Sequence, residues 1–358
     1  MAKTGRVFIL GAGFSHSHAQ WIGERRARVP LVRSFFREMI GFISGLKADQ
    51  PDAFRQWFRI VYLAAVAGGD RSRLADRAWL NRLPGDRRFL SRVNVEDLLP
   101  FASSSYALWR DLDLAPDRVR RRLLANLRSF PDYWVRAIGV YLNLFRAGRR
   151  SAISRFARNL RPGDVILTFN WDNLLEQACM RLGLAVRYHG PAFASGVVLL
   201  KLHGSVDWLR LEKRNPFRRT MLERLLGRVW RITDYPGFMD RHAVKYVPLI
   251  VPPVAAKTYT PELRGLWRDA VKALIGSSRV VVIGYSLPQS DHLARALMSW
   301  ASHPEFSRGW GRSVEVVDPC KQAFKRVREA LKGRGRIVWI PRRFEESKYA
   351  RVVRNGLF

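Results

Sequence analysis

Cysteine is scarce in this chain: its 358 residues include 2 cysteines, Cys179 and Cys320, which lie far apart in the sequence. Two such residues exclude a disulfide-rich scaffold, and they cannot supply a zinc site of four thiolates. We therefore expect no structural metal. Unpaired thiols are typical of the reducing cytoplasm, which is the compartment that we expect.

Long hydrophobic runs are also missing. The longest apolar stretch, residues 60–67, is far shorter than the roughly 20 residues that cross a bilayer. The apolar run near the N-terminus, residues 7–10, is too short for the hydrophobic region of a signal peptide. We expect a soluble protein without a membrane segment.

Acidic residues are few compared with basic ones. Lys and Arg number 63 and Asp and Glu number 30, so the formal net charge is +33. Such a field attracts polyanions, so nucleic acid, an acidic partner protein or an anionic ligand is expected. A generally arginine-rich proteome is the alternative, and a solvated face is the alternative for each basic cluster. The clearest clusters are Arg118–Arg122, Arg149 with Arg150, and Lys321–Arg336.

The stretch from residue 165 to residue 176 organises the chain. A turn at Pro162 and Gly163 precedes an apolar run that predicts a buried strand. Thr168, Asn170 and Asp172 follow at a spacing of two, which places them on one side of an extended chain. At the carboxyl edge of a sheet they could hold a polar ligand and activate one of its hydroxyls. They could equally serve only to cap the next helix.

A glycine-rich segment follows the first predicted strand, residues 7–10. Gly11 and Gly13 allow a tight turn and close approach of a phosphate, and Ser15 adds a hydroxyl. The helix that we expect next contains His16, His18 and Trp21. Two histidines two residues apart do not share a helix face, which argues against a metal site there.

Polar or small residues also follow three later strands. The run from Val197 to Leu202 leads into His203, which can act as a base near neutral pH. Gly284 and Ser286 come after the strand at residues 279–283. Asp318 ends another strand, in a position where carboxylates commonly hold a ribose.

Strands that alternate with helices predict the α/β class, with a Rossmann-like parallel sheet and a large helical insertion. We assign residues 1–30 and 151–358 to the nucleotide-binding and catalytic domain. Residues 31–150 carry aromatic residues at helical spacing and are predicted as the helical insertion. Residues 211–245 are basic and irregular, and we interpret them as a smaller insertion.

Five segments in this order resemble the sirtuin-like (SIR2-like) NAD-consuming domain family, and most closely its anti-phage defence NADase branch. They are Gly-Ala-Gly-Phe-Ser, Thr-x-Asn-x-Asp, Lys-Leu-His-Gly-Ser, Gly-Tyr-Ser and Val-Asp-Pro. The resemblance covers residues 5–20, 160–210 and 245–320. It implies a sirtuin-like fold with NAD+ as the substrate.

The resemblance also implies roles for single residues. Asn170 and Asp172 would face the nicotinamide ribose and carboxamide, and His203 would be the catalytic base. Gly284 and Ser286 would line the adenosine side, and Asp318 its ribose. The residues implied to contact NAD+ all lie at strand ends: Gly11, Ala12, Gly13, Phe14, Ser15, Thr168, Gly284, Ser286 and Asp318.

Two departures from the family pattern bear on the activity. Gly and Pro usually follow the first Ser, whereas Ala19, Gln20 and Trp21 stand here. Sirtuin deacylases also carry a four-cysteine zinc module, which this chain lacks, so deacylation is the weaker expectation.

We therefore expect a regulated NAD+ glycohydrolase that acts in prokaryotic anti-phage defence by NAD+ depletion, in a homo- or hetero-oligomer. The alternatives are an NAD-dependent protein deacylase or ADP-ribosyltransferase, and a non-catalytic nucleotide-sensing or nucleic-acid-binding subunit. The presence of both Asn170 and His203 argues against the non-catalytic alternative.

Overall fold

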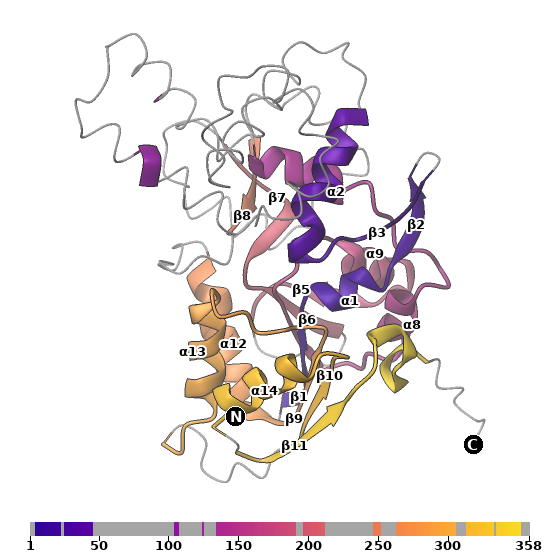
Figure 1. Cartoon of the computed structure of the whole chain (residues 1–358). Helices are drawn as coiled ribbons and strands as arrows, with labels where there is room; N and C mark the ends of the chain where they lie inside the picture. Colours follow the sequence, from indigo (N-terminus) through magenta and orange to yellow (C-terminus); the bar gives the residue numbers. More distant parts are fainter. Residues whose placement is uncertain are drawn as a thin grey trace.

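A computed structural model gives the structure of the chain (Figure 1). The described residues are 4–22, 25–45, 104–106, 124, 134–190, 196–211, 246–251, 263–305, 313–332 and 334–351. Much of the expected helical insertion, residues 31–150, lies outside these ranges, as do Arg118–Arg122 and nearly all of the expected insertion at residues 211–245. The boundaries of both insertions remain predictions.

A seven-stranded sheet in the order β11-β10-β9-β1-β4-β6-β5 forms the centre of the fold. Every pair of hydrogen-bonded neighbours in it is parallel, which confirms the predicted Rossmann-like parallel sheet. The strands are β1 (Thr4–Leu10), β4 (Val165–Thr168), β5 (Ala185–Arg187), β6 (Gly196–Lys201), β9 (Ser277–Ile283), β10 (Ser313–Val317) and β11 (Arg336–Ile340).

The strand order changes direction beside β1. From β1 the chain passes to β4, then to the edge strand β5 and back to β6, which lies between them. It later returns to β9 on the other side of β1 before reaching β10 and β11. In open α/β sheets, ligands bind outside the carboxyl ends of the strands at such a point. The fold therefore places a natural binding edge where Gly11, Asn170, His203 and Gly284 follow their strands.

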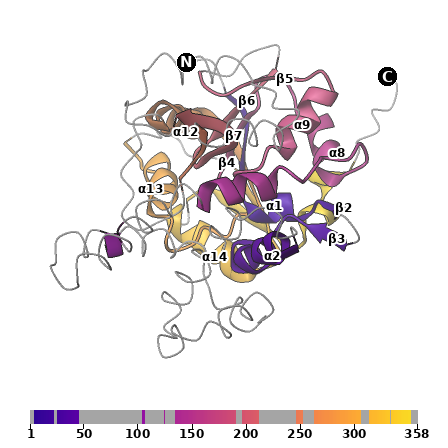
Figure 2. The ribbon, with the colours of Figure 1, turned by 90° about the horizontal axis from the view of Figure 1, so that it is seen from above.

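Helices flank the sheet: α12 and α13 lie on one side, and α8 and α9 lie on the other (Figure 2). Their bounds are α1 (Ala12–His16), α2 (Val32–Gly45), α8 (Ala152–Arg158), α9 (Leu174–Arg181), α12 (Arg264–Gly276), α13 (His292–Ala301) and α14 (Lys321–Ala330). Two short 3-10 helices, η4 (Phe344–Glu346) and η5 (Lys348–Ala350), follow β11.

An aromatic cluster packs between β1, α1, α8 and η4. The Phe156 ring makes edge contacts with Phe8 and Phe14, each with ring centroids 5.1 Å apart, and Phe344 lies 4.5 Å from Phe14. All four rings are buried. Because burial of such rings is strongly favourable, this cluster holds the glycine-rich end of β1 in place.

The predicted helix through His18 and Trp21 is wrong: α1 ends at His16 and an antiparallel hairpin follows, β2 (Ala19–Ile22) paired with β3 (Arg25–Arg28). The Ser17 hydroxyl donates to Phe14 O at 2.7 Å and so competes for a helix carbonyl. Beyond it, only Trp21 of β2 is exposed, between two partly buried neighbours. That alternation has the period of a strand.

A second antiparallel pair, β7 (Gly204–Leu211) and β8 (Tyr246–Ile250), flanks the segment predicted as the basic insertion.

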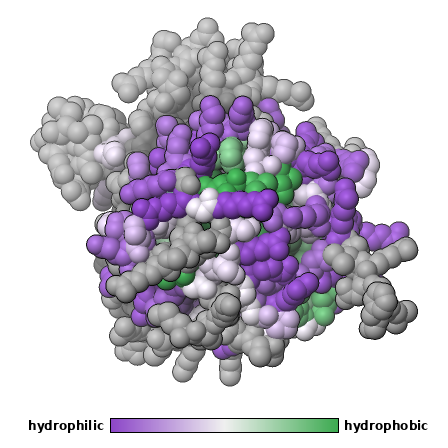
Figure 3. Space-filling view, turned by 90° about the horizontal axis from the view of Figure 1, so that it is seen from below, coloured by the Kyte–Doolittle hydropathy of each residue, from purple (hydrophilic) through white to green (hydrophobic). Residues whose placement is uncertain are grey.

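The lower face of the molecule is largely hydrophilic, with a hydrophobic band across it (Figure 3). None of the described helices is long and apolar enough to cross a membrane.

Candidate functional site at the carboxyl edge of the sheet

Asn170 joins the ends of the two central strands. Its Nδ2 atom donates to Gly11 O and to Ser15 Oγ, both at 2.8 Å, and its backbone N–H donates to Thr168 Oγ1 at 3.1 Å. Phe169 N–H donates to Leu10 O at 3.1 Å, which holds β4 and β1 in register up to this point. The amide of Asn170 therefore lies at the switch point, against the glycine-rich turn.

The glycines after β1 permit two strand ends to pack closely. A Cβ on Gly11 would lie 2.6 Å from Tyr285, and one on Gly13 would lie 2.8 Å from the Cα of Gly284. Gly284 has φ +58, a left-handed conformation that favours glycine. Contact between the ends of β1 and β9 is thus possible only without side chains at these positions.

The N–H groups of this turn already have backbone partners. Gly11 N–H donates to Ile283 O at 3.1 Å, and Gly13 N–H donates to Gly284 O at 2.8 Å. The Phe14 ring points into the aromatic core, and Ser15 is 2% exposed and bonded to Asn170. Contact between these residues, Ala12 included, and NAD+ stays a prediction. The glycines have a packing role in the structure.

His203 is buried at the end of β6, next to the end of β4. Leu202 N–H donates to Thr168 O at 2.9 Å, and Val251 N–H donates to His203 O at 2.9 Å, so the backbone is held on both sides. The imidazole is 3% exposed, and its centroid lies 5.0 Å from that of Phe169 in an edge arrangement. Asn170 and His203 therefore flank Phe169 at neighbouring strand ends.

Asp291 is the residue that the sequence did not reveal as part of this site. Its Oδ2 atom lies 3.2 Å from His203 Nε2 and accepts from the Tyr285 hydroxyl at 2.7 Å, and its Oδ1 accepts from Ala294 N–H at the start of α13. Phe169 stacks on Tyr285 with centroids 4.3 Å apart. The sequence marks Asp291 as the start of a helix, but nothing local indicates its contact with β6.

Asp172 has other hydrogen-bond partners than Asn170. The strand ends at Thr168, and beyond it the carboxylate of Asp172 accepts from Leu174 N–H at 3.2 Å at the start of α9. Its carbonyl accepts from Lys201 Nζ at 2.5 Å. The side chains of Asn170 and Asp172 thus have different partners, and the expectation that both face one ligand stays a prediction.

Lys201 is wholly buried beneath this turn and forms an ion pair with Glu176, Nζ to Oε1, at 2.7 Å. Burial raises the pKa of Glu176 to about 7, while the nearby Lys201 ammonium acts to lower it. A buried cation that has its carboxylate partner and a backbone carbonyl is satisfied. We interpret Lys201 as the residue that holds the turn between Asn170 and α9.

The residues predicted for the adenosine side lie further along the same edge. Gly284 N–H donates to Val317 O at 3.0 Å, which places the ends of β9 and β10 side by side. Ser286 is exposed, and Asp318 follows β10, with its carboxylate accepting from Cys320 N–H at 2.8 Å. Partial burial raises the pKa of Asp318, although that N–H and Arg326 oppose the rise.

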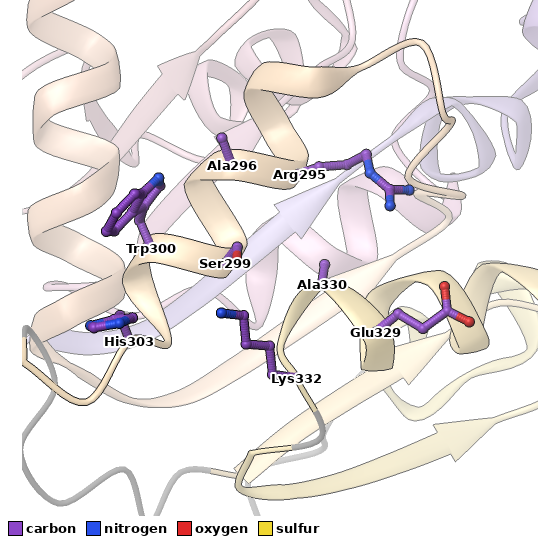
Figure 4. Close-up of a pocket in the computed structure, with 8 residues that line it drawn as sticks. All are labelled: Arg295, Ala296, Ser299, Trp300, His303, Glu329, Ala330 and Lys332. Carbon is purple, nitrogen blue, oxygen red and sulfur yellow. The ribbon is translucent and has the colours of Figure 1, made fainter.

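No group of three or more His, Cys, Asp or Glu side chains that could hold a metal occurs among the described residues. A cavity of about 470 Å³ lies elsewhere, between α13 and the end of α14 (Figure 4). Trp300, His303 and Lys332 line it. None of the residues that line this cavity is one of the strand-end residues described above.

No protein-family model matches the chain, and no curated protein matches it. Three similar solved structures are all Sir2 proteins. A Sir2 homologue in complex with NAD is 14% identical with a TM-score of 0.40, and the match covers 98% of this chain and 89% of that one. Sir2Tm bound to a propionylated peptide is 12% identical with a TM-score of 0.35, covering 97% and 91%.

A mutant Sir2 homologue in complex with 2′-O-acetyl ADP-ribose is 14% identical with a TM-score of 0.40, covering 98% of this chain and 92% of that one.

Proposed function

We propose that the chain is an NAD+ glycohydrolase that converts NAD+ and water into ADP-ribose, nicotinamide and a proton. The observation that carries the proposal is the pairing of buried His203 with buried Asp291 at the strand end next to Asn170. A histidine oriented by a carboxylate, beside an amide at a switch point, is an arrangement suited to proton transfer from a bound hydroxyl or water.

Asn170 and His203 have different roles in the proposed reaction. The bond between the nicotinamide nitrogen and C1′ of the ribose breaks, and the nitrogen keeps the electron pair. Positive charge then develops on the ribose, and polar groups positioned toward it lower the barrier. In our proposal the Asn170 amide orients the nicotinamide ribose, and His203 accepts a proton as water forms the new bond to C1′.

The other residues in this proposal shape the site or hold its catalytic groups in place. Gly11, Gly13 and Gly284 let the ends of β1 and β9 pack closely beside the site, and Asp318 is placed to accept a hydrogen bond from the adenosine ribose. Asp172 and Lys201 hold the turn that presents Asn170. The sequence resemblance further suggests that the enzyme serves anti-phage defence by depleting NAD+, in an oligomer or together with a partner protein.

The test is to incubate the purified full chain with NAD+ and to separate nicotinamide and ADP-ribose by chromatography. We expect Asn170→Ala and His203→Ala each to lower the rate by about 10²–10⁴-fold, the range for loss of a positioned acid or base. His189→Ala is the matched control, because His189 is exposed. Wild-type turnover in both site variants would refute the site.

The alternatives give different products in the same assay. A deacylase releases nicotinamide only when an acylated lysine peptide is present, and an ADP-ribosyltransferase labels a protein acceptor. A non-catalytic subunit releases no nicotinamide under any condition. Addition of nucleic acid to parallel samples shows whether hydrolysis needs an activator.

A further inference from the structure

The β2–β3 hairpin presents a tryptophan and two arginines on one face. Trp21 is 69% exposed, the highest value among the large hydrophobic side chains of the described residues. Its Cα partner across the hairpin is Arg26, and the pair two residues away joins Ala19 to Arg28. Side chains two apart on a strand share a face, so Trp21, Arg26 and Arg28 point the same way.

The opposite face anchors the hairpin to the domain. Gln20 Nε2 donates to Leu144 O at 2.6 Å, and Gln20 Oε1 accepts from Arg146 N–H at 2.6 Å. Ile22 and Ala27 pack against the core. His16 Nδ1 lies 2.7 Å from Val29 O at the base of the hairpin. The contacts on the opposite face of the hairpin therefore fix the position of the exposed Trp21 ring.

Further arginines continue the positive surface beyond Gln20. Arg146, Arg149 and Arg150 are exposed. Within the part of the chain that the structure describes, neither they nor Arg26 form an ion pair with a carboxylate, whereas Arg28 Nη1 lies 3.3 Å from Glu345. Partial burial and, after it, the nearby charge of Arg149 lower the pKa of Arg181. Arg149 and Arg181 thus lie near one another.

We propose that this hairpin surface, made of Trp21, Arg26, Arg28, Arg146, Arg149 and Arg150, binds single-stranded nucleic acid. An exposed ring can stack on a base, and the guanidinium groups beside it can neutralise phosphates. Bases in a duplex are already stacked and leave no face for Trp21. An acidic peptide would engage the arginines without needing the ring.

The hairpin lies on the opposite side of the molecule from α13 in both Figure 1 and Figure 2. Trp300, which is 57% exposed, instead lines the cavity beside α13 together with Glu329. The two exposed tryptophans therefore differ in their surroundings, and Trp300 is a natural control.

The test measures binding of a fluorescent oligothymidylate of about 16 nucleotides, the upper site size for one binding module, to the full chain without NAD+. We expect Trp21→Ala to raise the Kd by about 5- to 150-fold, the loss of one stacked base. Arg26→Ala should reduce the slope of log K against log salt by about 0.7. Trp300→Ala should leave the Kd unchanged.

Other outcomes overturn the proposal. These are unchanged binding in Trp21→Ala, loss of binding in Trp300→Ala, tighter binding of a duplex of the same length, and binding of a polyglutamate peptide but no oligonucleotide. Thermal unfolding of each variant shows that the fold is retained, which is expected because both tryptophans are exposed. Because NAD+ is absent, failure here leaves the proposed hydrolysis untouched.

Discussion

His203 Nε2 lies 3.2 Å from Asp291 Oδ2, and neither side chain is more than 3% exposed. A carboxylate at this position orients the imidazole and stabilises it when it gains a proton. The same carboxylate caps α13 through Ala294 N–H. One residue thus connects the proposed base to the helix that packs beside it.

Asp291→Asn separates these two roles. Asparagine caps a helix as well as aspartate does, so we expect little change in thermal stability. Loss of the charge should lower kcat for nicotinamide release, by as much as the roughly 10²–10⁴-fold that a positioned base contributes, with KM almost unchanged. Asp291→Ala should in addition cost about 0.5–2 kcal/mol of stability. A wild-type kcat in Asp291→Asn would exclude the orienting role.

Asn170 and Asp172 should respond differently to substitution. Asn170→Ala removes the amide at the switch point, and we expect at least about a 10²-fold loss of turnover. It should also cost about 1–3 kcal/mol of stability, because Gly11 O and Ser15 Oγ lose a hydrogen-bond donor. Asp172→Asn keeps an acceptor for Leu174 N–H, and we expect less than about a tenfold loss, because its carboxylate caps α9. If the two variants lose turnover equally, Asp172 also takes part in the chemistry.

Gly284→Ala should destabilise the protein, because alanine strains the backbone at this position. The new Cβ would lie 2.4 Å from Phe14 N in a residue with φ +58. Left-handed backbone costs a non-glycine residue about 1–2 kcal/mol, and overpacking adds about 1–3 kcal/mol. Gly265→Ala is the matched control, since a Cβ there meets nothing within 4 Å. Denaturant unfolding of the two variants measures the difference, and equal midpoints would contradict the close packing of β1 and β9.

Ionisation of Glu315 should make the free energy of unfolding depend on pH. Burial acts to raise its pKa, but hydrogen bonds from Lys348, Tyr349 and Arg279 outweigh burial and lower the pKa below its usual value. The folded state therefore binds fewer protons than the unfolded state, and the stability present above pH about 4.3 is lost as pH falls through the lowered value.

We expect Glu315→Gln to cost about 1 kcal/mol at pH 7, because both cationic partners are half exposed. The difference from the wild type should shrink below pH about 4. Thermal unfolding between pH 7 and pH 3 measures it, and Glu329→Gln serves as an exposed control. A constant difference across that range would rule out the ionised carboxylate as the source.

The local pattern of residues predicted most of what lies along each strand. Apolar runs ending at Leu10, Thr168 and Ile283 indicated buried parallel strands, and small or polar residues after them indicated the binding edge. Because parallel strands present their carboxyl ends at one edge, the sequence alone already grouped Gly11, Asn170, His203 and Gly284. Asp172 joined that group in sequence, but its carboxylate faces the start of α9 instead.

Two features could not be predicted from the sequence, because they depend on contacts between distant segments. The hairpin at Trp21 was predicted as helix, since its alternation spans only a few residues and its anchor, Leu144, lies far along the chain. The pairing of Asp291 with His203 arises where α13 packs against the end of β6. Hydrophobic period and turn chemistry are local, so the sequence by itself determined the central parallel strands, the small or polar residues that follow them and the net charge. Which buried polar groups meet is decided by packing, because only the assembled sheet and helices bring them within hydrogen-bond distance.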